Sequence, residues 1–176
     1  MASIFSFGED NGTPSGSPPR GATRTFQRSE CNWKNIDDSS TAYSSQPIMA
    51  GGNSFTKFQF GAISGTWNTL SNGKFAHTSG TFGGGLTLRV FITSGYAQPA
   101  TGTFSSGVDF TATGTIAASG QTVLFSQTGP EGTQSASVNT VGTGYTQYFV
   151  TQLQTTTGAA PGDTATAELT FQYDES

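Results

Sequence analysis

Residues 163–174, DTATAELTFQYD, alternate strictly between apolar and polar side chains, and this pattern constrains the fold more than any other stretch of the chain. The apolar positions are Ala165, Ala167, Leu169, Phe171 and Tyr173. A period of two over this length predicts a β-strand with one buried face. We therefore expect these five side chains to point into a hydrophobic core.

Similar short segments recur along the whole chain, whereas no segment has the period of an amphipathic helix. Strands are expected within 24–36, 53–63, 86–96, 107–119, 121–129, 145–157 and 163–174, with a loop at 37–47 and a hairpin over 65–82 that turns at Asn72-Gly73. The last two strands are expected to pair across the GAAPG turn at 158–162. Strands at intervals of about 8 to 12 residues favour an all-β, antiparallel β-sandwich, either immunoglobulin-like or a jelly roll.

The N-terminal region has a different composition. Residues 9–23, EDNGTPSGSPPRGAT, are so rich in proline and glycine that we expect no regular structure there. The predicted organisation is an extended arm at 1–23 followed by the β-sandwich domain at 24–176. The arm is either a free tail or a segment that orders on a partner. In the second case, contacts are expected from Arg20, Arg24 and Arg28, which no acid balances between Asn11 and Ser29, and from Trp33 and Lys34.

Charge and composition exclude several function classes. Charged residues make up only 10% of the chain, against about 25% in an ordinary globular protein. The net charge is -4, and all seven Lys and Arg residues lie at or before Arg89, so clustered phosphate contacts and a nucleic-acid partner are not expected. The chain also has no apolar run of transmembrane length and no signal-peptide pattern at its start, so we expect no membrane partner and synthesis in the cytoplasm.

The sequence offers no recognisable catalytic or metal-binding motif. His77 is the single histidine and Cys31 the single cysteine, which excludes a usual zinc site and an internal disulfide. No nucleophile elbow or calcium loop is present, and the glycine-rich segment 80–87 lacks the Lys-Ser/Thr of a phosphate loop. We expect His77 to be a surface or packing residue, and we expect no enzyme activity, no metal and no cofactor.

Three segments carry a resemblance to a known class of proteins. They are CNWKNIDDSSTAYSSQPIMAG at 31–51, NGKFAHTSGTFG at 72–83 and GYTQYFVTQLQTTTGAAPGDTATAELTFQYDE at 144–175. They resemble structural virion proteins of tailed, cyanophage-type bacteriophages, in particular capsid decoration (cement) proteins. The resemblance implies a protein on the capsid exterior that binds the major capsid protein or another virion protein, is a homo-oligomer, often a trimer, and has no catalytic residues.

Two function classes remain open at this point. The first is the structural virion protein, for which a surface of threonine and glutamine has a physical advantage: such side chains can be buried against neighbours at lower cost than unpaired charges. The second is a carbohydrate-binding or adhesin-like β-sandwich, for example a tail or fibre component. That alternative requires exposed aromatic rings such as Trp67, Tyr96 or Tyr145 to stack on sugars.

Overall fold

A computed structural model describes residues 3–115, 122–139, 142–160 and 167–176. Its eleven strands are β1 (Ile4–Ser15), β2 (Arg20–Arg28), β3 (Lys57–Gly65), β4 (Leu70–Ser79), β5 (Leu86–Thr93), β6 (Val108–Asp109), β7 (Phe125–Ser126), β8 (Ser137–Val138), β9 (Gly142–Thr146), β10 (Tyr148–Thr155) and β11 (Glu168–Glu175). The helical structure in the described residues is one 3₁₀ turn, Tyr43–Ser45. The prediction of an all-β fold is confirmed.

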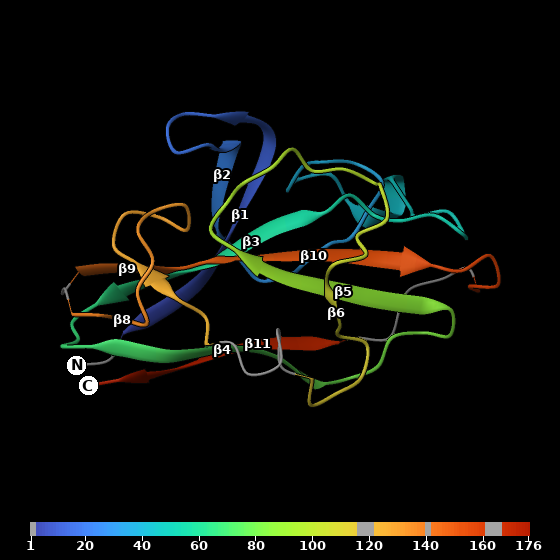
Figure 1. The fold of residues 1–176 in the computed structure, drawn as a ribbon. Coiled ribbons are helices and arrows are strands. Elements are labelled where there is room, and N and C mark those ends of the chain that lie inside the picture. Colours follow the sequence, from blue (N-terminus) through green and yellow to red (C-terminus); the bar gives the residue numbers. More distant parts are fainter. Residues whose placement is uncertain (1–2, 116–121, 140–141, 161–166) are drawn as a thin grey trace.

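The strands form two antiparallel sheets that pack as a sandwich. The larger sheet has the order β2-β1-β3-β10-β5-β6, with β9 pairing with β3 and β7, and the smaller sheet has the order β11-β4-β8. In Figure 1, β4 and β11 form the lower layer, β3, β10 and β5 form the layer above it, and the β1–β2 hairpin rises from the top of the molecule. The smaller sheet therefore covers one face of the larger sheet only.

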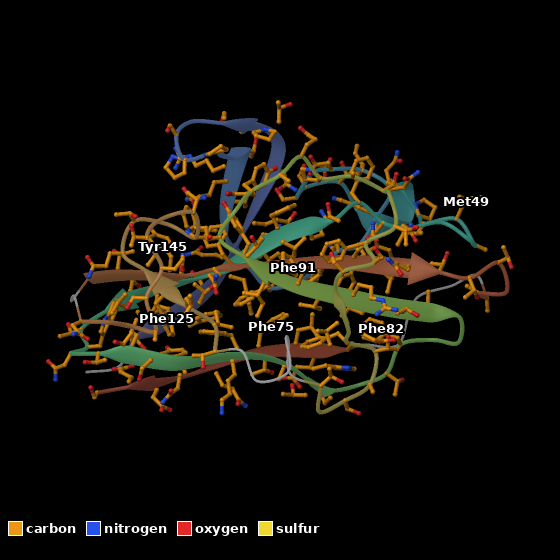
Figure 2. All side chains as sticks on the ribbon, viewed as in Figure 1. Met49, Phe75, Phe82, Phe91, Phe125 and Tyr145 are labelled. Atoms are coloured by element: carbon orange, nitrogen blue, oxygen red, sulfur yellow. The ribbon has the colours of Figure 1, made fainter. Side chains whose placement is uncertain are left out.

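Aromatic side chains fill the space between the two sheets. Phe75 of β4 stacks on Phe149 of β10, with ring centroids 4.3 Å apart and an interplanar angle of 2°. Phe171 of β11 lies 5.6 Å from Phe149, and Phe110 stacks on Phe75. Figure 2 shows Phe75 between the layers. A second buried cluster lies on the opposite face of the large sheet and consists of Phe58, Phe60, Tyr96, Tyr148 and Val150.

The apolar side chains of the C-terminal strand point into the core, as its alternating pattern predicted. In β11, Phe171 is buried, Leu169 and Tyr173 pack on the central core, and Glu168 and Gln172 are exposed. Ala165 lies outside the described residues. β5 also follows its predicted pattern, since Leu88 and Val90 are fully buried in the same core.

The predicted pairing of the last two strands is wrong. β10 lies between β3 and β5 in the large sheet, whereas β11 pairs with β4 in the small sheet. The physical reason is burial. The first six residues of β10 are all buried, as expected for a central strand covered on both faces, whereas β11 has one wet face and suits the edge of the sandwich.

The predicted hairpin turn at Asn72-Gly73 is also wrong, because both residues lie inside β4. Asn72 has a φ of 54°, and the pairing with β11 shifts in register between Gln172 and Asp174, so this pair forms an irregularity in a continuous strand. A Cβ on Gly73 would lie 2.9 Å from the carbonyl oxygen of Val123. Glycine is therefore needed here for close packing and not for a turn.

The most consequential correction concerns the N-terminal region. Residues 9–23 were expected to lack regular structure, but β1 and β2 form a hairpin, β1 pairs with β3, and the predicted boundary between residues 23 and 24 falls inside β2. The glycines have packing roles: a Cβ on Gly8 would lie 2.3 Å from the Phe60 ring, and a Cβ on Gly21 would lie 2.6 Å from the Asn11 amide nitrogen. Pro18 and Pro19 lie in the turn between the two strands.

Other predicted strands are shorter than expected. Within 24–36, strand structure ends at Arg28, and in the described parts of 107–119 and 121–129 the strands β6 and β7 have two residues each. Residues 37–47 form the expected loop, with the 3₁₀ turn in it.

Candidate functional site

The base of the β1–β2 hairpin contains an unusual concentration of buried charge. Glu9 and Asp10 are adjacent in β1, so their side chains point to opposite faces of the large sheet. Both are at most 1% exposed. Because a buried carboxylate without partners is costly, each face must supply its own partners.

On the outer face, Asp10 is held by Arg24 and Tyr148. Arg24 donates hydrogen bonds of 2.8 and 2.7 Å to the two carboxylate oxygens of Asp10, and a third of 2.9 Å to Glu131. The Tyr148 hydroxyl donates to Asp10 at 2.5 Å. The guanidinium of Arg24 also lies over the Phe60 ring, with its Cζ 4.9 Å from the ring centroid. These contacts tie the hairpin to β10 and to the loop that carries Glu131.

The surroundings of Tyr148 and Arg24 favour the protonated form of both side chains. Burial and the hydrogen bond to Asp10 raise the pKa of Tyr148 above its ordinary value, so the phenol stays protonated. Burial opposes the charge of Arg24, but its hydrogen bonds to Asp10 and Glu131 outweigh that effect and raise its pKa. The arrangement holds the Arg24 guanidinium between the carboxylates of Asp10 and Glu131.

On the inner face, Glu9 is held by Lys57 of β3. The Lys57 ammonium lies 3.0 Å from Glu9 Oε1 and also donates to the backbone carbonyl of Asp38 at 2.7 Å. Asn11 and Gln59 donate their side-chain amides to Glu9 at 3.0 and 3.2 Å. The ion pair therefore sits beneath the 29–41 segment, which closes over this end of the sandwich.

The 29–41 segment is also held in place by an ion pair between two of its own residues. Lys34 is fully buried and donates to Asp38 at 2.5 Å and to the carbonyl of Thr41. Burial opposes the charge of Asp38, but hydrogen bonds from Lys34 and Thr41 hold its pKa well below the ordinary value. Asp37 accepts hydrogen bonds from the Asn11 side chain and the Gly12 amide of β1.

These contacts determine which of the predicted partner-binding residues can contact a partner at the surface. Arg20 is exposed at the tip of the hairpin. Arg24 and Lys34 are committed to internal ion pairs, so they are not surface contacts. Trp33 is half-buried and donates its indole N–H to Thr151 at 3.0 Å. Arg28 is half-buried at the end of β2. The structure therefore does not bring the five residues together on one surface.

Next to this region, a cavity of about 1370 Å³ opens between the two sheets. Its walls come from both sheets and from the segment that follows β2, and they include Phe7, Trp33, Tyr43, Met49, Leu153 and Leu169. Figure 2 shows Met49 at the outer edge of the molecule, where its side chain is 72% exposed. Sequence reasoning missed this cavity, because it depends on how the two sheets diverge.

The two residues with reactive side chains have packing roles. His77 is fully buried in β4, and its two ring nitrogens lie 3.0 Å from the carbonyl oxygens of Phe110 and Ser79. The expectation that it is a packing residue agrees with this environment. Cys31 is half-buried beside the cavity, and burial raises the pKa of its thiol to about 12, which keeps it protonated near neutral pH.

Among the residues that the structure describes, no group of three or more His, Cys, Asp or Glu side chains is placed to hold a metal ion. No helix in this part of the chain has the length and apolar character needed to cross a membrane. No protein-family model, curated protein or solved structure matches the chain.

Proposed function

We propose that this chain is a structural protein of a tailed-phage virion, without enzyme activity, that binds the exterior of the capsid as a decoration protein. Its partner would be the major capsid protein or another virion protein. The proposal rests on the resemblance of the three sequence segments given above and on one structural observation, which is the inward placement of charge.

Internal ion pairs take up a large part of the few charges in the chain. Three of the seven basic residues and four of the eleven acidic residues form the salt bridges described above. The exterior is correspondingly poor in charge and rich in Ser, Thr and Gln. A protein that lies against neighbours in many copies benefits from such a surface, because hydroxyl and amide groups can be satisfied by single hydrogen bonds when they are buried.

The β1–β2 hairpin is the element best placed to reach a neighbour. It projects from the body in Figure 1, and its tip at residues 13–20 is exposed throughout. The network at its base fixes its direction, so binding through the tip does not require a disordered arm to fold first. A preorganised element loses less conformational entropy on docking than a flexible one.

The alternative is a carbohydrate-binding or adhesin-like module, and the observation in its favour is the cavity, whose walls include Trp33 and Tyr43. The aromatic residues first considered for this role do not form an exposed row. Trp67 and Tyr96 are buried, and Tyr145 is half-buried. The decoration protein is therefore the function that we favour.

The test is to locate the chain on particles. Virions purified from the source of the sequence would be labelled with an antibody against the chain and imaged by electron microscopy. We expect label over the capsid, whereas label confined to tails or fibres, or no label on any particle, would overturn the proposal. In parallel, the isolated chain would be tested on a glycan array, where specific sugar binding would favour the alternative.

A second experiment addresses the hairpin. A variant in which residues 15–20 are replaced by Asn-Gly keeps the network at the base but removes the tip, since the flanking residues Pro14 and Gly21 are paired neighbours. Its binding to capsids that lack the chain would be measured by cosedimentation, with Asp109→Ala, an exposed change on β6, as the control. Weaker binding of the shortened variant is expected. Unchanged binding would show that capsid contacts lie on the sandwich body.

A further inference from the structure

The two sheets leave two long strands with an unpaired edge. In the described part of the chain, β2 is paired through its backbone only with β1, and β11 only with β4. They have nine and eight residues. An edge strand of this length presents a row of free N–H and C=O groups that can add another strand.

The two edges carry opposite charge. β2, RGATRTFQR, contains three arginines and no acid, and β11, ELTFQYDE, contains three acids and no base. Arg24 is neutralised inside the hairpin, which leaves Arg20 and Arg28 at the two ends of β2. On β11, Glu168 lies at one end and Asp174 and Glu175 at the other, and all three are exposed.

We propose that copies of this chain join head to tail, with β2 of one copy adding to β11 of the next. Pairing of two like edges would bring arginines near arginines or carboxylates near carboxylates, which is unfavourable across strands. Pairing of unlike edges brings opposite charges together at both ends. The charges thus select one contact and reject the two symmetric ones.

The positions of the two edges favour contact between copies over contact within one copy. In Figure 1 the hairpin lies at the top of the molecule and β11 near the bottom. The charges lie near both ends of each strand, so they match in either direction, and the antiparallel direction is favoured because its hydrogen bonds are slightly more stable. The new contact would also shelter Phe26 of β2, whose side chain is 47% exposed.

Such a contact uses two different surfaces and is heterologous, so repetition closes into a ring or continues as a filament. The inference deepens the proposed function by naming a sister copy as a partner, but it is tested on the isolated chain without any particle. Self-association with no particle binding would overturn only the proposed function, and particle binding by a chain that stays monomeric would overturn only this inference.

The experiment compares two charge-reversed variants by analytical ultracentrifugation over a range of concentrations. One variant carries Arg20→Glu and Arg28→Glu on β2, and the other carries Glu168→Lys and Asp174→Lys on β11. We expect the unmodified chain to associate and each variant to associate at least about tenfold more weakly, because opposite-charge cross-strand pairs become like-charge pairs. A mixture of the two variants should associate again, since each now offers an edge that matches the other.

The controls separate this contact from general effects of charge. Glu30→Lys with Asp109→Lys changes the net charge as much as the β11 variant but lies on neither edge, and it should associate like the unmodified chain. If the double β2 variant fails to fold by circular dichroism, Arg20→Glu alone, at an exposed position, replaces it. Hydrogen exchange of the unmodified chain should slow in β2 and β11 as concentration rises. A monomeric unmodified chain, or a mixture that fails to associate, would overturn the proposal.

Discussion

The ion pair between Glu9 and Lys57 gives the sharpest test of the buried charge network. Lys57→Met keeps the length of the side chain and removes its ammonium group. Among the described residues, Glu9 would then lose the one cation that contacts it and keep the amide donors of Asn11 and Gln59. Because both partners are about 1% exposed, water cannot replace the lost charge. Breaking such a pair costs about 3 to 5 kcal/mol in the free energy of unfolding, a large share of the roughly 5 to 15 kcal/mol of a typical domain.

The double variant Glu9→Leu with Lys57→Met should recover most of that loss. Replacing a buried ion pair by apolar side chains is neutral or stabilising by about 1 to 4 kcal/mol. Against this gain stands the amide of Gln59, which loses its carboxylate acceptor at a cost of about 1 to 3 kcal/mol. The two effects nearly cancel. The free energy of unfolding of the double variant should therefore be close to that of the unmodified chain and well above that of Lys57→Met alone.

Urea denaturation followed by circular dichroism measures these differences, with the slope of unfolding free energy against urea expected to stay constant. Lys74→Met, at an exposed position in β4, serves as the matched control and should change stability by no more than about 0.5 kcal/mol. Two results would refute the reasoning. One is a loss below about 1 kcal/mol for Lys57→Met, and the other is a double variant whose loss equals the sum of the losses measured for Lys57→Met and Glu9→Leu separately.

Three further predictions use other parts of the structure. Phe171→Ala should lower the free energy of unfolding by about 3 to 5 kcal/mol in urea denaturation, because the ring packs between the sheets; a loss below about 1 kcal/mol would place it outside the core. Stability should fall as pH rises above about 10, because the pKa of Tyr148 is raised in the folded state and the unfolded chain therefore releases that proton first. The same titration of Tyr148→Phe should show a smaller alkaline loss, and an identical loss would contradict the assignment. Cys31 should react with a thiol reagent at pH 8 much more slowly in the folded chain than in denaturant, and equal rates would show that its thiol is accessible.

The sequence by itself determined the fold class and the inward faces of its clearest strands. The alternation of Leu169, Phe171 and Tyr173 is local, since successive side chains of any strand point to opposite faces. It therefore holds whichever strand lies alongside. The same reasoning correctly assigned Leu88 and Val90 of β5 to the core.

The tertiary structure alone decided which strands are neighbours. β10 and β11 follow one another in the sequence, yet they belong to different sheets. The sequence contained one sign that β10 is a central strand, because its residues do not alternate between apolar and polar. In the structure, β10 buries Thr151 and Gln152 along with its apolar residues. A polar side chain can occupy a central strand when it is hydrogen-bonded, as Gln152 is to the carbonyl oxygens of Ser54 and Gly102. Those acceptors lie far away in the sequence, so the pattern of β10 could not be interpreted without them.

The N-terminal hairpin shows the same limit most clearly. Its composition predicted an unstructured arm, because glycine and proline are locally unfavourable to a strand. Its stability comes from partners that lie far along the chain: Lys57 is 48 residues from Glu9, and Glu131 is 107 residues from Arg24. The sequence shows that these charges exist, but only the folded chain brings them into contact. Burial then makes the pairing obligatory, because charges removed from water must find partners within the protein.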